Sequence, residues 1–249
     1  MTTPLILSIE TATIGGSVWL GFGTVPLTTR VGDPEVSQSA SLLRDISDCL
    51  DEAGVKLAEV DVFACAAGPG SFTGLRIGIA TLKALAASLT RPCVGIPTLQ
   101  AVALSGGPST ATVALLPAGR GEVFAQLFSV TDDGVVRDLD TAAHLTPPKL
   151  LERYAGFQNL NWAGSGAHLQ RDFLESCARE LGIHFFDEMT VAEGVKGDPM
   201  WYLAPLERNL ATQVAALALQ LFQKGAIQSP DSLSAIYVRP SDAELNQCR

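Results

Sequence analysis

Basic residues are scarce in this sequence. It has 17 Lys and Arg residues against 26 Asp and Glu residues, which gives a formal net charge of −9. A surface that neutralises several phosphates by itself is normally rich in Lys and Arg, so we expect no tight, direct binding of nucleic acid by this chain. Within an assembly the field of all members counts, so a contribution inside a complex stays open.

Residues that bind metals or form disulfides are also few and scattered. The five cysteines never form a CxxC pair, and the three histidines, His144, His168 and His184, have no HxH or HxxxH spacing. Such a distribution predicts buried thiols, and it favours neither a disulfide framework nor a dedicated metal site.

Long apolar runs are missing as well. No run reaches the roughly 18 residues of a membrane-spanning helix, and the first ten residues lack the basic start and apolar stretch of a signal peptide. We therefore expect a cytoplasmic protein without a membrane contact. With 249 residues, of which 47% are hydrophobic, the chain has enough apolar material for one large domain or two modest lobes.

Periodicity predicts alternating strands and helices. Residues 4–10 and 17–22 are short and apolar, and Gly15-Gly16 between them is typical of a hairpin turn. Between Ser39 and Ala53 apolar residues recur at steps of three and four, which predicts an amphipathic helix that ends at Gly54. Further strands are expected at residues 25–31, 60–67, 92–96, 112–116, 123–130, 160–163 and 235–238, and further helices at residues 71–89, 99–104, 149–154, 168–181 and 210–222.

This alternation predicts an α/β fold. Residues 105–110 (Ser-Gly-Gly-Pro-Ser-Thr) concentrate the residue types that interrupt regular structure, and they are the best candidate for a boundary between two lobes. We expect a first lobe over residues 1–105 and a second over residues 106–249, with the option that a late helix returns to the first.

A glycine-rich loop follows the predicted strand at residues 60–67. Its glycines allow a tight turn and bring backbone N–H groups to the start of a helix, where an anion is favoured. The alternative is that the loop only turns the chain and its serine caps the helix. The candidate phosphate contacts are Gly68, Gly70, Ser71, Thr73 and Gly74.

A second polar group, Glu10, Thr11 and Thr13, stands at the end of the first strand. In actin-like and sugar-kinase-like ATPases such an arrangement holds phosphate oxygens and a hydrated magnesium ion. Carboxylates and threonines at strand ends are also common turn formers, so both interpretations stay open. Elsewhere no local motif joins a nucleophile, a base and an orienting acid, and catalysis is not visible.

The helix at residues 71–89 is apolar over most of its circumference, with Arg76 and Lys83 as a narrow charged strip. One flank is expected to pack on its own sheet. The other flank needs cover, either from elsewhere in the monomer or from a partner protein, and its small residues allow a second helix to approach closely.

Three segments together resemble the TsaB family: residues 5–13 (LILSIETAT), residues 68–80 (GPGSFTGLRIGIA) and residues 121–124 (GEVF). Their order and spacing match as far as about Phe128, and residues 236–239 (IYVR) resemble the family's last strand. Residues between 135 and 230 match loosely.

The resemblance implies a two-lobed actin-like or sugar-kinase-like fold without an intact catalytic site. It implies a partner subunit that serves the catalytic subunit TsaD, together with the ATPase TsaE, in forming threonylcarbamoyladenosine in tRNAs that read codons beginning with adenine. It also implies association through the helices at 39–53 and 71–89, with TsaD or, when the chain is alone, with a second copy as a homodimer. The expected contact residues are Leu42, Ile46, Leu50, Leu75, Ile79 and Leu82.

Departures from the family pattern bear on catalysis. Relatives commonly have Asp at the position of Glu10, Asp at the position of Pro117 and Arg near Gly119, and the paired histidines of TsaD-like subunits have no counterpart. We therefore expect no catalytic residue, no metal and no tightly bound cofactor. ATP is expected to bind, if at all, at the interface of a complex, and tRNA is expected to be contacted only indirectly. The rival hypotheses are an ATPase or kinase of actin-like fold and, less favoured, a metal-dependent peptidase.

Overall fold

The computed structural model describes residues 3–187 and 198–238. Contacts divide the chain into two compact units, one of residues 1–101 with 208–249 and one of residues 102–207. The division lies between Ala101 and Val102, inside the helix Thr98–Ser105, whereas the sequence predicts a boundary after residue 105. The late helix α7 (Leu210–Gln223) belongs to the first unit.

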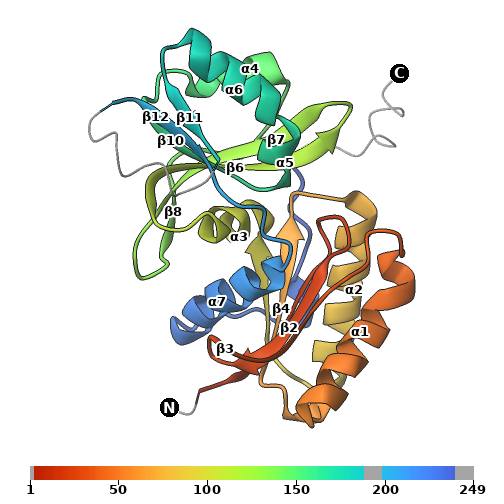
Figure 1. The fold of residues 1–249 in the computed structure, drawn as a ribbon. Helices are drawn as coiled ribbons and strands as arrows, with labels where there is room; N and C mark the ends of the chain where they lie inside the picture. Colours follow the sequence, from red (N-terminus) through yellow and green to blue (C-terminus); the bar gives the residue numbers. More distant parts are fainter. Residues whose placement is uncertain (1–2, 188–197, 239–249) are drawn as a thin grey trace. The chain divides into compact units, whose positions relative to one another are not determined.

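The first unit is built on a five-stranded sheet in the order β3-β2-β1-β4-β5. β1 pairs with β2, and β2 with β3, in the antiparallel direction, whereas the β1–β4 and β4–β5 pairs are parallel. Figure 1 shows α1 and α2 on one face of this sheet and α7 on the other. The strands are β1 (Leu5–Glu10), β2 (Ser17–Phe22), β3 (Val25–Val31), β4 (Val62–Gly68) and β5 (Cys93–Pro97), and the two helices are α1 (Gln38–Ala53) and α2 (Phe72–Ser88).

Burial follows the place of each strand in this sheet. All residues of β1 and β4, the central strands, are buried, because helices cover both of their faces. In the edge strand β3 most residues are exposed. The short 3-10 helices η1 (Leu57–Glu59) and η3 (Pro230–Ser232) flank the unit, and α3 (Thr98–Ser105) leads into the second one.

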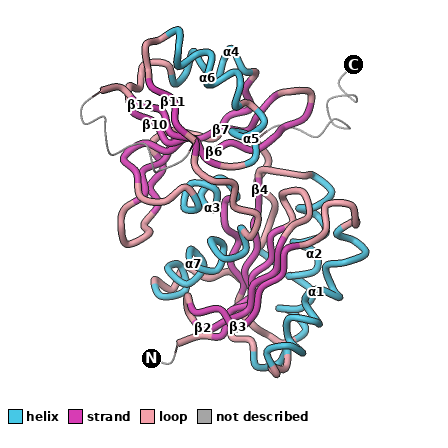
Figure 2. Tube along the Cα trace, in the orientation of Figure 1, coloured by secondary structure: helices cyan, strands magenta, loops and turns pink. Residues whose placement is uncertain are grey.

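The second unit has a sheet in the order β11-β12-β10-β6-β7-β8, with β9 paired to β7. Figure 2 shows its strands in magenta beside the helices α4, α5 and α6. Its core includes Trp162 and Trp201, whose ring centroids lie 5.1 Å apart in an edge-to-face arrangement. The elements are β6 (Ser109–Gly119), β7 (Glu122–Val130), β8 (Val136–Asp138), β9 (Ala143–Leu145), β10 (Asn159–Ala163), β11 (His184–Phe186), β12 (Met200–Leu203), α4 (Pro147–Tyr154), α5 (Ser165–Leu169) and α6 (Arg171–Glu180).

The predicted α/β class is confirmed, and so are most predicted elements. The helix ending at Gly54 is confirmed in detail, since Gly54 adopts a left-handed conformation with φ 64°. Two predictions are wrong. The helix expected at 168–181 is broken at Gln170, where α5 ends and α6 begins, and no strand forms at 235–238 in the described chain, where Ile236 makes one backbone hydrogen bond to Ala67.

Candidate functional site

The carboxyl ends of β1 and β4 bring the two predicted polar segments together. These strands are parallel neighbours, so the loops that follow them meet at one edge of the sheet. The loop after β1 carries Thr11, Ala12 and Thr13, and the loop after β4 begins α2. The backbone N–H of Ser71 donates to the carbonyl oxygen of Ala12 at 2.8 Å, which joins the two loops directly.

Three glycines of the second segment allow this close approach. A Cβ atom on Gly70 would lie 2.6 Å from Ala12, one on Gly74 would lie 1.9 Å from the Thr11 carbonyl oxygen, and one on Gly78 would lie 2.1 Å from the Thr11 hydroxyl oxygen. Real Cβ contacts of that length essentially do not occur. The glycines are therefore required by packing between the loop and the helix.

The start of α2 is engaged by this chain itself. Ser71 caps the helix, because its hydroxyl accepts a hydrogen bond from the Gly74 N–H at 3.2 Å. Thr11 and Ala12 fill the space beside Gly70 and Gly74. The capping that the sequence allowed is thus observed, and whether the N–H groups at this helix start also bind an anion stays a prediction.

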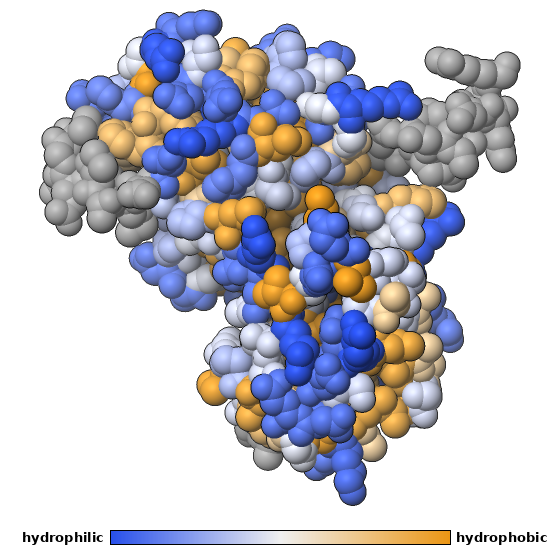
Figure 3. Space-filling model, turned by 45° about the vertical axis from the view of Figure 1, so that its right-hand side comes forward, coloured by the Kyte–Doolittle hydropathy of each residue, from blue (hydrophilic) through white to orange (hydrophobic). Residues whose placement is uncertain are grey.

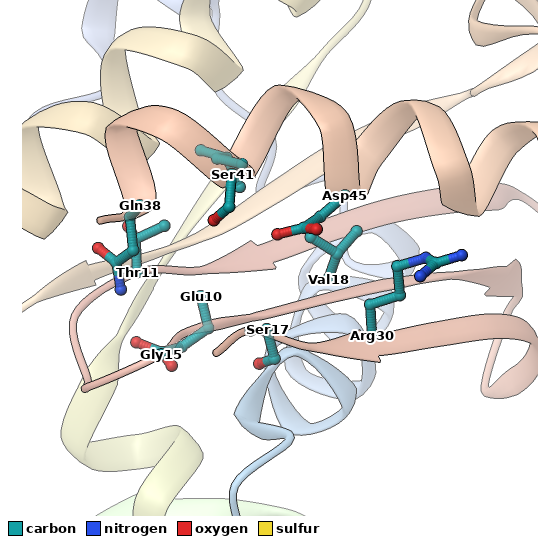
Figure 4. A pocket seen from close by; sticks show the side chains of 11 residues that line it. Glu10, Thr11, Gly15, Ser17, Val18, Arg30, Gln38, Ser41 and Asp45 are labelled. Atoms are coloured by element: carbon teal, nitrogen blue, oxygen red, sulfur yellow. The ribbon is translucent and has the colours of Figure 1, made fainter. Parts of the chain in front are cut away.

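Glu10 is fully buried, and both of its carboxylate oxygens are used within the β1–β2 turn. One oxygen accepts the Thr13 N–H at 2.8 Å and the other accepts the Thr13 hydroxyl at 2.6 Å. Burial raises the pKa of the Glu10 carboxyl, and the hydrogen bonds from Thr13 and Ala12 oppose that rise. Figure 4 shows the carboxylate pointing toward the turn. Its evident role is to close the turn.

A small pocket lies between this turn and α1. Gln38 donates to the Thr13 carbonyl oxygen at 2.9 Å, while Ser41 and Asp45 reach in from α1 (Figure 4). Arg30 of β3 lines the same pocket and forms ion pairs with Asp48 and Glu52 on α1 at 3.8 and 3.2 Å. The lining residues supply hydroxyl and carboxylate groups together with the Arg30 guanidinium, so the pocket offers polar groups of both charge signs.

Sequence reasoning did not single out Gln38 or Arg30. Gln38 stands before the apolar repeat of α1, and Arg30 belongs to an edge strand, so neither is part of a recognisable motif. The alternation along β3 was the available signal, because Thr28 and Arg30 point toward α1 and both contact Glu52.

The six expected contact residues of the two helices lie inside the first unit. Their exposed fractions are between 0 and 9%, because they face the sheet. This corrects the expectation that these side chains themselves meet a partner, because they are buried inside the unit and hold the helices in place. The residues are Leu42, Ile46, Leu50, Leu75, Ile79 and Leu82.

The exposed neighbours form an outer face on α1 and α2. Leu43 of α1 is 64% exposed, and Ala80, Ala84 and Ala87 of α2 are exposed beside the half-buried Ile77. In Figure 3 apolar side chains, in orange, alternate with hydrophilic ones over the part of the first unit in view. We call Leu43, Ile77, Ala80, Ala84 and Ala87 the outer face.

Comparison with known proteins places this chain in a family. Residues 35–185 match the family model of TsaD, tRNA N6-adenosine threonylcarbamoyltransferase. The tRNA threonylcarbamoyladenosine biosynthesis protein TsaB of Escherichia coli K12 is 34% identical over 152 residues, which cover 59% of this chain and 65% of that protein. A tRNA N6-adenosine threonylcarbamoyltransferase of Sphingopyxis alaskensis is 40% identical over 75 residues, 29% of this chain and 22% of the enzyme. The chain thus matches less than two thirds of the length of these curated relatives.

Solved structures share the fold along almost the whole chain. YeaZ from Pseudomonas aeruginosa superposes with a TM-score of 0.70 at 24% identity, over 94% of this chain and 99% of that one. A protein described as similar to the peptidase YEAZ from Pseudomonas aeruginosa superposes with a TM-score of 0.71 at 25% identity, over 95% of this chain and 100% of that one.

No helix in the described part of the chain is long and apolar enough to cross a membrane.

The predicted resemblance is confirmed by the match to TsaB and by the family model, which covers more than half of the chain. The chain belongs to the TsaD family of tRNA threonylcarbamoyladenosine biosynthesis proteins and is a homologue of TsaB.

Proposed function

We propose that this protein is a partner subunit of TsaD in the formation of threonylcarbamoyladenosine in tRNA, and that it binds TsaD through the outer face of α1 and α2. The homology to TsaB supports the pathway. The observation that carries the binding mode is the outer face: α1 exposes a leucine and α2 exposes three alanines, and both helices pack on the same face of one sheet.

The chemistry of the outer face suits a helix of a partner protein. Alanine side chains are short, so a second helix can approach α2 closely. Leu43 can then pack between side chains of that helix. The buried residues beneath, among them Leu75 and Leu82, fix α2 on the sheet, so little ordering remains to be done on binding.

A non-catalytic role agrees with the chemistry at the loops. Both carboxylate oxygens of Glu10 accept hydrogen bonds from Thr13, and Thr11 and Ala12 pack against Gly70 and Gly74. The chain thus contributes binding surface, and the transfer reaction belongs to the partner. TsaE as a further member, ATP at the interface of the complex, indirect contact with tRNA and a cytoplasmic location are parts of the same proposal.

The test is association with TsaD from the same organism, followed by sedimentation velocity. Ala84→Glu puts a charge in the centre of the outer face, and because Ala84 is exposed the variant is expected to fold. Burying an unpaired carboxylate at an interface should weaken TsaD binding by about a hundredfold or more.

The matched control is Ala226→Glu, which adds the same charge at an exposed alanine after α7. It should bind TsaD like the unchanged protein. If Ala84→Glu binds TsaD with unchanged affinity, the outer face is not the contact. If the unchanged protein does not bind TsaD at all, the partner-subunit proposal fails as a whole.

A further inference from the structure

Two aromatic rings and a guanidinium group cluster at the start of α2. The ring centroids of Phe72 and Tyr237 are 5.6 Å apart, and the guanidinium carbon of Arg76 lies 3.9 Å from the Phe72 centroid. The exposed fractions are 37% for Phe72, 51% for Tyr237 and 40% for Ile236. We call Phe72, Arg76, Ile236 and Tyr237 the Arg76 patch.

The C-terminal segment of the described chain holds this patch in place. Gln228 exchanges two backbone hydrogen bonds with Cys93, at 2.9 and 3.0 Å. Leu233 is 2% exposed and belongs to the core of the first unit, and the Ile236 N–H donates to the Ala67 carbonyl oxygen at 2.7 Å. Tyr237 therefore extends from an anchored segment, and the patch needs little ordering before it binds.

The charge of Arg76 is uncompensated among the described residues. Arg76 forms no ion pair in the described chain, although the protein as a whole carries a net charge of −9. A guanidinium stacked on a ring keeps its N–H edge directed outward, where it can form two parallel hydrogen bonds with a carboxylate. Five other arginines do form ion pairs: Arg30, Arg91, Arg153, Arg171 and Arg179.

The patch borders the outer face of the same helix. At about 100° per residue, Arg76 lies roughly 80° around the helix from Ala84, and Phe72 lies one turn before Arg76 on the same stripe. A helix that covers Ala80 and Ala84 therefore passes within reach of the long Arg76 side chain.

We propose that the Arg76 patch is the charged rim of the TsaD-binding surface and that Arg76 receives a carboxylate from the partner. This rests on the proposed function. Tyr, Phe and Arg are typical of the residues that dominate binding energy at protein interfaces. A protein carboxylate suits the patch better than a nucleic acid, because the single guanidinium of the patch neutralises few phosphates.

The experiment compares the affinity for TsaD of the unchanged chain, Arg76→Ala, Arg76→Lys and a control, Arg179→Ala, at low and at high salt. Arg179 is an exposed arginine of the second unit. Arg76→Ala should weaken binding by about tenfold at low salt and by less at high salt, because salt screens the ion pair. Arg76→Lys should recover only part of the loss, since lysine lacks the planar fork, and Arg179→Ala should change nothing.

Several outcomes overturn the proposal. If Arg76→Ala binds TsaD as tightly as the unchanged chain while Ala84→Glu does not, the outer face stands and the role of Arg76 falls. If neither variant matters, the proposed function falls with it. If Arg76→Ala loses affinity for tRNA and keeps it for TsaD, the ligand is a phosphate.

The acidic residues Asp242 and Glu244 of this chain's own tail are the other source of a carboxylate. Deleting residues 239–249 tests it. If Arg76→Ala raises TsaD affinity and the deletion raises it to the same extent, the tail is the occupant of the patch and the proposal is overturned. If Arg76→Ala weakens TsaD binding equally in the full-length and the shortened chain, a carboxylate from TsaD is supported.

Discussion

The backbone N–H of Ser71 donates to the carbonyl oxygen of Ala12 across 2.8 Å, and this bond ties the start of α2 to the loop that follows β1. Around it Gly70 and Gly74 touch the main chain of the same loop. The glycine loop thus serves packing between two loops at one edge of the sheet, so changes to its glycines should alter the stability of the first unit.

Gly74→Ala should destabilise the first unit. The added Cβ would lie 1.9 Å from the Thr11 carbonyl oxygen, which is backbone and cannot move aside cheaply. We expect a loss of about 1–3 kcal/mol in the free energy of unfolding, measured by urea titration. Gly156→Ala, where a Cβ meets nothing within 4 Å, is the control and should change stability little. Equal midpoints for the two variants would show that the loops are not closely packed in solution.

The stability of the protein should depend on pH through Glu10. Burial raises the pKa of the folded carboxyl above its unfolded value, so the folded state holds its proton to higher pH. Stability from this group is therefore full below the unfolded pKa, near 4, and falls as pH rises through the raised folded pKa.

Glu10→Gln removes that titration and keeps an oxygen to accept the Thr13 N–H. Its stability relative to the unchanged protein should rise as pH is increased from about 4 toward neutral, as the ionisation penalty appears only in the unchanged protein. Urea midpoints over this range measure the difference. A difference that does not vary with pH would mean that Glu10 titrates normally.

Leu233→Ala should cost about 2–5 kcal/mol, because Leu233 is 2% exposed in the core of the first unit and the truncation leaves a cavity. Leu43→Ala, at a leucine that is 64% exposed, should stay within about 0.5 kcal/mol of the unchanged protein. The pair tests whether the C-terminal segment is part of the folded unit. A harmless Leu233→Ala would contradict that.

The isolated chain should not bind ATP measurably in a calorimetric titration. Thr11 and Ala12 pack tightly against Gly70 and Gly74, and both oxygens of the Glu10 carboxylate already accept hydrogen bonds from Thr13. Saturable heat from ATP, lost in Glu10→Gln, would restore the ATPase hypothesis to consideration.

Much of the fold was predictable because the signals are local. The β1–β2 hairpin, the helix that ends at Gly54 and the buried strand before the glycine loop each follow from periodicity and turn residues over a dozen positions or fewer. The short strands β8, β9 and β11 have three residues each, too few for a period to show. At Gln170, where the predicted helix is broken, the side chain donates to the Gly121 carbonyl oxygen, and this contact with a residue 49 positions away leaves no local sequence signal.

The residues of the candidate site were predictable from the sequence, but the contacts that they make were not. The sequence shows Glu10, Thr13 and the glycines, and their types allow either a ligand site or a packed turn. Only the pairing of β1 with β4 shows that the two segments meet, because it puts Ala12 against Gly70.

By itself, the sequence determined the α/β class, the amphipathic nature of α1 and the family resemblance, all of which rest on residue order over short spans. The tertiary structure alone decided which side of each helix is covered. Leu42 and Leu43 are adjacent leucines, yet Leu42 is 5% exposed and Leu43 is 64% exposed. Successive residues of a helix point about 100° apart, so only one of the two faces the sheet, and that sheet is assembled from strands far apart in the sequence.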